Sequence, residues 1–169
     1  EAMETLQSAN NMAMCLQRLG RLTEAESQFR ENARIIVRLK GEDDPETLNF
    51  LQNLGFVLSA EQKMDEAEKI WRNVLERRRA VLGEFHRDTL KTINGIAYVL
   101  QHQGRLSESE RFSREAVEVA KRVLGEDHPD TLIYKSNFGS LLRDQGKLAE
   151  AEPYFREAVE MRRRVLGVD

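Results

Sequence analysis

The feature of this sequence that most constrains its fold is a recurrence with a period of 42 residues. The dipeptide Thr-Leu recurs at this spacing, at Thr5-Leu6, Thr47-Leu48, Thr89-Leu90 and Thr131-Leu132. Four such units span all but one of the 169 residues. Because a period of this length indicates stacked supersecondary units, the sequence predicts a single repeat domain over 1–169. Its repeats are expected at about 1–41, 42–83, 84–125 and 126–167.

A nine-residue connector marks each boundary between repeats. Its clearest copy, Leu124 to Leu132, reads Leu-Gly-Glu-Asp-His-Pro-Asp-Thr-Leu, and related copies lie at 82–90 and, more degenerate, at 40–48. The glycine suits the left-handed turn that ends a helix, and Pro129 favours the first turn of the next helix. The connector therefore predicts that one helix ends and another begins in each copy.

Aligned columns predict a first helix in every repeat. Leucine occupies one column throughout, preceded by a small residue three positions earlier: Ala13/Leu16, Gly55/Leu58, Ala97/Leu100 and Gly139/Leu142. The small residue allows another helix to approach closely. The helix is expected to end near Gly20, Gln62, Gly104 and Gly146.

A second helix follows, in which a small residue precedes a large one by four positions. The pairs are Ala25/Phe29, Ala67/Trp71, Ser109/Ser113 and Ala151/Phe155. Repeat three breaks the alternation because Ser113 replaces the aromatic residue, while Phe112 stands one position earlier. Either that ring turns inward, or the core of repeat three is thinner.

Polar residues predict how the second helix is stabilised. Thr23, Asp65 and Ser107 each precede a Glu by three positions, as in a capping box. The fourth copy has Ala149 at this position, so the N-terminus of its second helix is expected to be about 1 kcal/mol less stable. Each Glu also precedes an Arg by four positions, which predicts four ion pairs on the helix surface. The runs 77–79 and 162–164 are interpreted as arginines favoured near helix C-termini rather than as a phosphate-binding patch.

Composition excludes several functional classes. The net charge is −3 with interleaved signs, which does not favour nucleic-acid binding, and no stretch is apolar enough for a membrane span. Cys15 shares a column with Val57, Val99 and Leu141, so we expect it to be a small buried hydrophobic residue. Because it is the single cysteine and cannot form an internal disulfide, we expect a reducing, cytoplasmic setting. The chain begins at Glu1 and ends at Asp169 without an initiator Met, which suggests a fragment of a longer array.

No catalytic constellation is present in the sequence. His86 and His128 occupy equivalent connector positions in consecutive repeats, about 10 Å or more apart, so they are not expected to share a metal ion. His102 lies near the far end of a first helix. No phosphate-binding loop, nucleophile elbow or zinc-protease motif occurs. We therefore expect no enzymatic activity, no catalytic residue, no cofactor and no metal.

The column pattern of Ala13, Leu16, Gly20, Ala25 and Phe29 resembles the tetratricopeptide repeat. The 42-residue period, the connector at 124–132 and Glu150-Ala151-Glu152-Pro153 in repeat four are similar to kinesin light chain repeats and to related bacterial and fungal signalling arrays. This resemblance implies an all-α, right-handed superhelical solenoid of four helix-turn-helix repeats. It also implies that first helices line a concave surface, where a protein or peptide ligand binds.

We assign peptide binding to the columns expected on that surface. They contain Asn10, Asn11, Met14, Arg18, Asn49, Gln52, Asn53, Phe56, Lys91, Asn94, Tyr98 and Asn137, with Arg143 adding charge; His102, Ser136 and Ser140 share the same face. Amide side chains can both donate hydrogen bonds to a peptide backbone and accept them from it. In the families that the chain resembles, an Asn of the column that holds Asn11, Asn53 and Asn137 contacts bound peptides. These amides are alternatively explained as polar groups that only solvate a helix.

Two further readings concern partners. Some tetratricopeptide modules clamp a terminal carboxylate with cations, but only Lys91 fits, and Gly95 and Ile133 do not. The alternative function is an assembly or sensor array that self-associates weakly end to end or contacts a missing effector domain, because Val159 and Val165 of the last helix are expected to be partly exposed.

Overall fold

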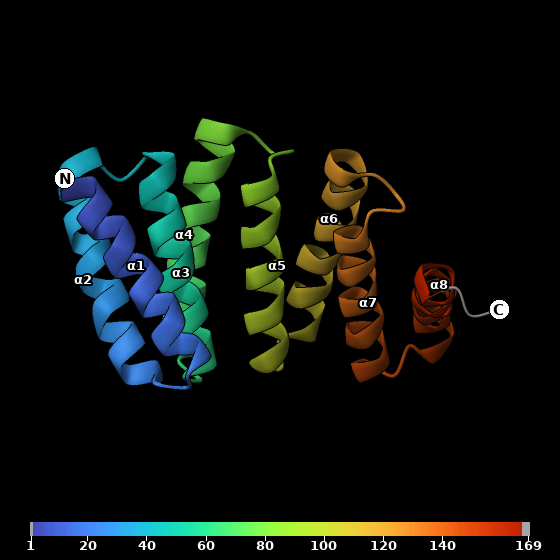
Figure 1. The fold of residues 1–169 in the computed structure, drawn as a ribbon. Helices are drawn as coiled ribbons and strands as arrows, with labels where there is room; N and C mark the ends of the chain where they lie inside the picture. Colours follow the sequence, from blue (N-terminus) through green and yellow to red (C-terminus); the bar gives the residue numbers. More distant parts are fainter. Residues whose placement is uncertain (1, 167–169) are drawn as a thin grey trace. The chain divides into compact units, whose positions relative to one another are not determined.

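The computed structural model describes residues 2–166 and is all-α over that range. Its helices follow one another as four hairpins (Figure 1). They are α1 (Ala2–Arg18), α2 (Leu22–Lys40), α3 (Pro45–Ala60), α4 (Met64–Leu82), α5 (Arg87–His102), α6 (Leu106–Leu124), α7 (Pro129–Asp144) and α8 (Leu148–Leu166). The expected all-α series of four helix-turn-helix repeats is confirmed. The side chains of Arg162, Arg164 and Val165 lie outside those that the structure describes.

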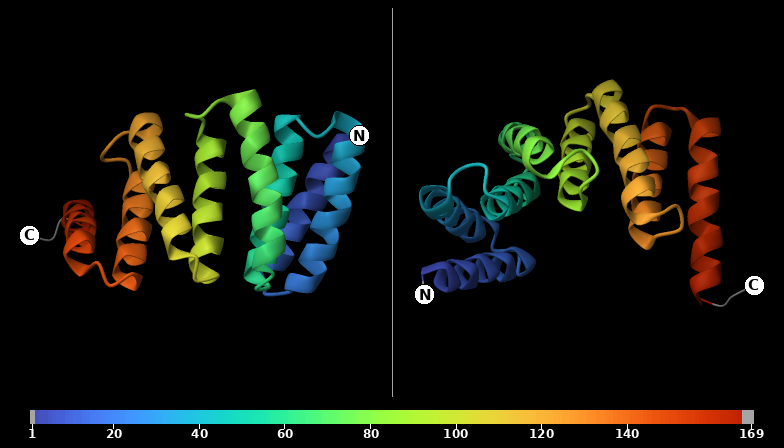
Figure 2. Two further views of the ribbon diagram at one scale, coloured as in Figure 1. Left: turned by 180° about the vertical axis from the view of Figure 1, so that it is seen from behind. Right: turned by 90° about the horizontal axis from the view of Figure 1, so that it is seen from above.

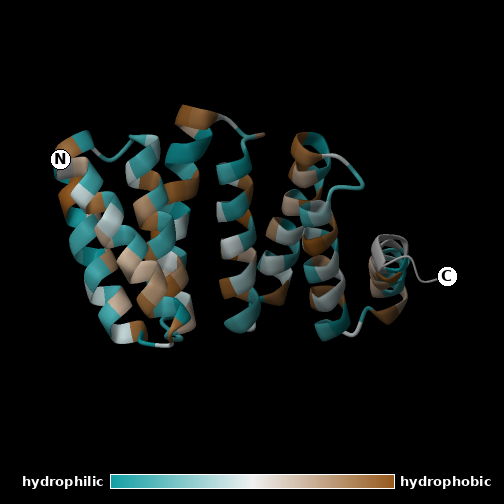
Figure 3. Ribbon diagram, in the orientation of Figure 1, coloured by the Kyte–Doolittle hydropathy of each residue, from teal (hydrophilic) through white to brown (hydrophobic). Residues whose placement is uncertain are grey.

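The helices form two compact units, which are described separately. Unit 1 comprises residues 1–83 with α1 to α4, and unit 2 comprises residues 84–169 with α5 to α8. Within each unit every helix packs against the next one in the chain. Figure 2 shows these neighbours from two further directions. Hydrophobic and hydrophilic residues alternate along the helices (Figure 3), as expected of helices that bury only one side.

The first helices of repeats two to four begin two residues before the Thr-Leu pair, at a side-chain cap. Asp44 accepts a hydrogen bond from the backbone N–H two residues ahead, at 2.9 Å. His86 and His128 do the same through Nδ1, each at 3.1 Å. Sequence reasoning gave these histidines no structural role. Their column equivalence to Asp44, a strong capping residue, was the signal that could have revealed it.

Glycine ends the second helices as expected, but with a different backbone geometry. Gly41, Gly83 and Gly125 have φ of 86°, 89° and 102° with ψ near extended values, at 172°, 168° and 159°. This region is essentially restricted to glycine and is not the left-handed helical turn that we expected. The chain therefore leaves the helix through one extended glycine and turns again before the next cap. Thr131 then holds the connector to the helix end, because its Oγ1 donates to the carbonyl of Gly125 at 2.7 Å.

The predicted capping boxes are wrong. α2, α4 and α6 begin one residue before the expected caps, and their N-cap residues Arg21, Lys63 and Arg105 make no side-chain cap. The backbone N–H of each of these three residues instead bonds to a carbonyl of the first helix, at 2.9–3.0 Å. The tight turn thus leaves no extended residue that could place Thr23, Asp65 or Ser107 at a cap. Because these caps do not form, the weaker N-terminus that we expected for α8 at Ala149 no longer follows.

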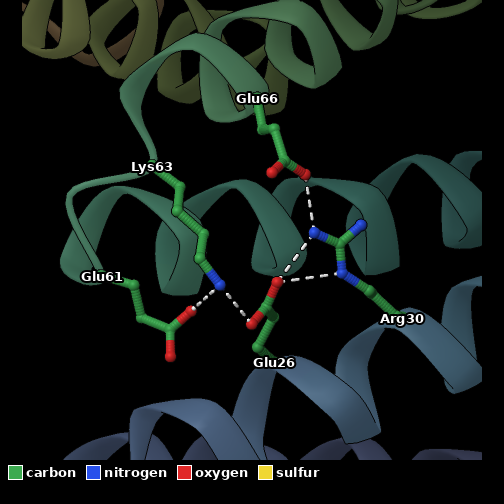
Figure 4. Close-up of polar contacts among 5 residues, drawn as sticks. All are labelled: Glu26, Arg30, Glu61, Lys63 and Glu66. Carbon is green, nitrogen blue, oxygen red and sulfur yellow. Dashed lines mark hydrogen bonds and ion pairs between the residues drawn. The ribbon is translucent and has the colours of Figure 1, made fainter.

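Ion pairs link neighbouring helices within a unit. Glu26 binds Arg30 on its own helix and Lys63 in the turn before α4, both at 2.7 Å (Figure 4). Burial opposes ionisation of Glu26, but hydrogen bonds from Lys63 and Arg30 outweigh it and lower its pKa to about 2. In unit 2, Lys147 reaches Glu110 at 2.7 Å and lowers the pKa of that carboxyl to about 2.

All four predicted Glu–Arg pairs of the second helices are present, so that prediction is confirmed. They join Glu26 to Arg30, Glu68 to Arg72, Glu110 to Arg114 and Glu152 to Arg156. The pairs are partly exposed, and each therefore contributes only a few tenths of a kcal/mol.

Small residues of the first helices admit the large residues of the second helices. A Cβ added at Gly55 would lie 2.1 Å from Nε1 of Trp71, so only glycine fits beneath this indole. Trp71 is buried, and its Nε1 donates to the backbone carbonyl of Gln52 at 3.1 Å. In repeat one, Ala13 accompanies the smaller buried ring of Phe29. The expected close approach of another helix at the small residue of the first helix is confirmed at Gly55.

The prediction for Cys15 is wrong, because its side chain is exposed. The equivalent Val57, Val99 and Leu141 are fully buried. α1 packs against α2, and no described helix precedes it on the other side. Between residues 2 and 166, no helix combines the length and apolar character that crossing a membrane requires.

Candidate functional site

Six of the eight residues assigned to peptide binding in unit 1 lie on an accessible face of α1 or α3. Asn11, Met14, Arg18, Asn49 and Phe56 are exposed, and Asn53 is half-buried. Asn10 and Gln52 are buried, so their assignment to the surface is wrong. In unit 1 this column is turned away from solvent, whereas Asn94 of the same column is half-buried in unit 2.

A buried arginine explains the position of Gln52. Arg78 of α4 lies in the interior of unit 1, where its guanidinium donates to Oε1 of Gln52 at 2.9 Å and to Oδ1 of Asn49 at 2.7 Å. Its neighbour Arg77 pairs with Glu42 and Asp43 of the connector. These two arginines of the run 77–79 hold helices together, which agrees with a structural role and not with a phosphate site.

Phe56 of unit 1 rests on a filled core. Its ring contacts Trp71 edge-on, with centroids 5.1 Å apart and planes at 72°. The side chain of Phe56 is 41% exposed, so one edge faces solvent while the other is supported. This arrangement gives unit 1 an accessible aromatic surface that Trp71 supports.

Unit 2 has a recess beside Tyr98, the residue equivalent to Phe56. It has a volume of about 220 Å³, and α5, α6 and α7 form its walls. The lining residues are Asn94, Ala97, Tyr98, Gln101, His102, Ser113, Asn137 and Ser140. Three residues assigned to peptide binding, Asn94, Tyr98 and Asn137, are therefore brought together around one cavity. His102 and Ser140, expected on the same face, complete its edge.

The recess exists because repeat three lacks a large residue in its second helix. Ser113 occupies the column of Phe29 and Trp71, and its small side chain lines the cavity where those residues place buried rings. Phe112 is half-buried and does not line the recess. Of the two alternatives open from sequence, the structure supports the thinner core.

Neutral polar groups surround this recess. Asn137 Nδ2 lies 3.4 Å from Oδ1 of Asn94, and Gln101 Nε2 donates to Asp144 at 2.7 Å. That hydrogen bond, followed by one from Arg143, lowers the pKa of Asp144. Each amide retains a second polar atom with which to bind a ligand. The recess can therefore offer both donors and acceptors without placing a bare charge inside it.

Two of the cations assigned to the site lie elsewhere. Lys91 pairs with Asp88 at 2.9 Å near the start of α5. Arg143 pairs with Asp144 at 3.1 Å and lines a second cavity of about 510 Å³ on α7 and α8, together with Leu148, Phe155 and Val159. Neither lines the recess with Tyr98.

The histidines make separate structural contacts. His86 and His128 cap helices, whereas the ring of His102 stacks on Tyr98 with centroids 4.2 Å apart and planes at 48°. Within the described part of the chain, no three His, Cys, Asp or Glu side chains are grouped so that they could hold a metal ion.

Comparison with known proteins identifies the family. A tetratricopeptide repeat model matches residues 4–60 and 88–164, and a second tetratricopeptide repeat model matches residues 47–88. This chain belongs to the tetratricopeptide repeat family. Tetratricopeptide repeat proteins are typically non-catalytic and generally mediate protein–protein contacts. No curated protein matches the sequence.

Solved structures share the fold of this tetratricopeptide array at low sequence identity. A putative kinesin light chain from Podosopora anserina is 19% identical, with a TM-score of 0.84 over 95% of this chain and 76% of that chain. BtubC (BKLC) from P. vanneervenii is 18% identical, with a TM-score of 0.85 over 96% of this chain and 65% of that chain. A double mutant of MamA RS-1 is 16% identical, with a TM-score of 0.65, over 94% and 76%. The resemblance to kinesin light chain repeats is confirmed at the level of fold.

Proposed function

We propose that this chain is a protein-interaction scaffold that binds an extended peptide or a partner helix on its first helices. The observation that carries this proposal is the gathering of Asn94, Tyr98 and Asn137 around one recess in unit 2. The columns of Asn137 and Tyr98 also place Asn53 and Phe56 on an accessible face of α3 in unit 1. The family resemblance adds that these helices line the concave side of such arrays. We also propose a cytoplasmic location, because a single cysteine cannot form an internal disulfide.

The proposed mechanism divides affinity from specificity. The amides of Asn53 and Asn137 donate to and accept from the ligand's backbone, which tolerates many sequences. Phe56 and Tyr98 provide apolar contact for individual side chains, and such aromatic residues often dominate binding energy at interfaces. A ligand would thus be held along its backbone and selected at a few pockets.

A peptide-library screen on the intact chain tests this function. Peptides that bind should lose about 1–2 kcal/mol of affinity in Asn137→Ala, and a similar amount in Asn53→Ala, because each substitution removes hydrogen bonds to the ligand. Asn73→Ala is the matched control, since Asn73 is an exposed amide on the second helix α4. The proposal would be refuted if peptide affinity were unchanged in both Asn53→Ala and Asn137→Ala, or if no peptide bound at all.

Self-association is a second candidate because α8 leaves a repeat-packing face uncovered. Leu148 and Val159 are 65% and 49% exposed, whereas Val117 of α6, the equivalent of Val159 in the same unit, is 4% exposed. A first helix of a second copy could cover this face as the following helix does elsewhere in an array. Light scattering over a concentration series should show a mass that rises with concentration and falls to the monomer value in Val159→Asp. A monomer at every concentration would exclude this candidate.

A further inference from the structure

The recess above Ser113 occupies the place of a missing ring. In unit 1 the same column holds Phe29 and Trp71, whose rings are buried beneath the first helices. We propose that the recess of unit 2 binds a single-ring aromatic side chain, tyrosine or phenylalanine, of a bound peptide. This inference rests on the proposed function, because it assigns a specificity pocket to the same peptide-binding face. The ligand would supply the ring that repeat three lacks.

Ala97, which lines the recess together with Ser113, favours a single ring over an indole. Trp71 fits only because Gly55 stands opposite, where an added Cβ would meet the indole at 2.1 Å. Repeat one instead pairs Ala13 with the phenyl ring of Phe29. Repeat three carries Ala97 in this column, and Ala97 lines the recess. Repeat three therefore has the same small residue as repeat one, Ala, but Ser113 stands where repeat one has the ring of Phe29.

Tyr98 provides an aromatic wall for the incoming ring. Its unit 1 equivalent, Phe56, contacts Trp71 edge-on at 5.1 Å, whereas Tyr98 is 44% exposed and stacks only on His102 among the aromatic contacts described. Aromatic pairs favour centroid separations of about 4.5–7 Å. A ligand ring seated above Ser113 would restore for Tyr98 the kind of contact that Phe56 already has.

The polar edge of the recess suits a neutral ligand. Asn94, Asn137 and Ser140 can bond to the backbone of the residue that carries the ring or to the hydroxyl of a tyrosine. The carboxylate of Asp144, which accepts a hydrogen bond from the lining residue Gln101, also accepts one from Arg143. A charged side chain entering this recess would lose hydration without gaining an opposite charge.

The test compares variants that fill the recess or leave it open. Peptides are selected from a random library on the intact wild-type chain, and their Kd is measured by calorimetry. Ser113→Phe should weaken binding at least tenfold because its ring takes the ligand's place, while Ser113→Ala should change it little. Replacing the peptide's single-ring residue by Leu or Trp should weaken wild-type binding. In the Ala97→Gly variant, the affinity of the Trp-substituted peptide should rise relative to that of the parent peptide.

The outcomes separate the two proposals. Selected peptides whose affinity Ser113→Phe leaves unchanged would overturn the ring recess, whereas the proposed function would stand. Failure to select any peptide would overturn the proposed function and the recess together. If Ser113→Phe does not fold by circular dichroism, the peptide substitutions decide alone. Equal affinity of the parent, Leu and Trp peptides for the wild type would then overturn the assignment.

Discussion

In unit 1 the ring of Phe56 leans on Trp71, whereas in unit 2 the equivalent Tyr98 stands beside a recess whose floor is Ser113. The succession of helices and the ion pairs Glu26–Lys63 and Glu110–Lys147 recur in both units. At one column of the second helix, repeats one and two carry buried rings, whereas repeat three carries Ser113 beside a recess.

This difference shows how a repeat array can acquire a specific site without changing its fold. The stability of stacked repeats depends on packing distributed over many columns, so one unit can lose a ring and still fold. The space released opens onto the face that carries the amides Asn94 and Asn137. Substitutions that exchange the two patterns should reveal how much stability a filled core contributes.

The largest effect is expected when unit 1 is given the pattern of unit 2. Trp71→Ser removes a buried indole and its hydrogen bond to the carbonyl of Gln52. Removal of a buried aromatic side chain typically costs 3–5 kcal/mol, so we expect about 4 kcal/mol of destabilisation in urea unfolding. Trp71→Phe, which keeps a ring, should cost less than half as much. A loss below about 1 kcal/mol for Trp71→Ser would show that unit 1 does not depend on its indole.

A smaller loss is expected when the space beneath the indole is closed. In Gly55→Ala the new methyl would overlap Trp71, which should cost about 2–3 kcal/mol in urea unfolding despite the better helix propensity of alanine. The double variant Gly55→Ala, Trp71→Phe reproduces the Ala13–Phe29 pair of repeat one. It should therefore recover most of the loss. No recovery would contradict the equivalence of the two repeats.

The ion pairs should make the two units respond alike to acid. The pKa values of Glu26 and Glu110 are both lowered from 4.5 to about 2 in the folded chain. Their stabilisation is therefore complete above about pH 4.5 and is lost as the pH falls toward 2. Because Lys63 and Lys147 are about 40% exposed, we expect only about 1 kcal/mol from each.

Urea unfolding between pH 6 and pH 2.5 checks this expectation. Glu26→Gln and Glu110→Gln should each be less stable than the wild type at pH 6, and the difference should shrink at acid pH. Glu31→Gln, at an exposed residue of α2, serves as the control. A difference that persists unchanged at pH 2.5 would exclude ionisation of these carboxyls as its cause.

The smallest effect is expected when unit 2 is given the pattern of unit 1. Ser113→Phe fills the recess with apolar surface and should raise the unfolding free energy by about 1 kcal/mol, since the ring remains open to solvent on one side. Ser113→Ala should be close to neutral. Thermal unfolding followed by circular dichroism measures both. A marked loss of stability in Ser113→Phe would indicate that the recess is too narrow for a ring.

Sequence reasoning predicted the helix pairs, the glycine positions and the small–large columns, because each depends on residues that recur at a fixed spacing. It failed where a role depends on a neighbouring helix. Gln52 was placed on the surface, but Arg78 draws it into the interior. Cys15 was placed in the core, but no described helix covers that face of α1.

The sequence by itself determined the repeat, its period and the position at which one unit lacks an aromatic residue, since local backbone preferences and column identity require no partner. Only the tertiary structure decided what that absence means. A missing ring can be replaced by a neighbouring side chain or left as a space, and the packing of α5, α6 and α7 around Ser113 settles the choice. The recess is a property of three helices together, which no single segment of the sequence encodes.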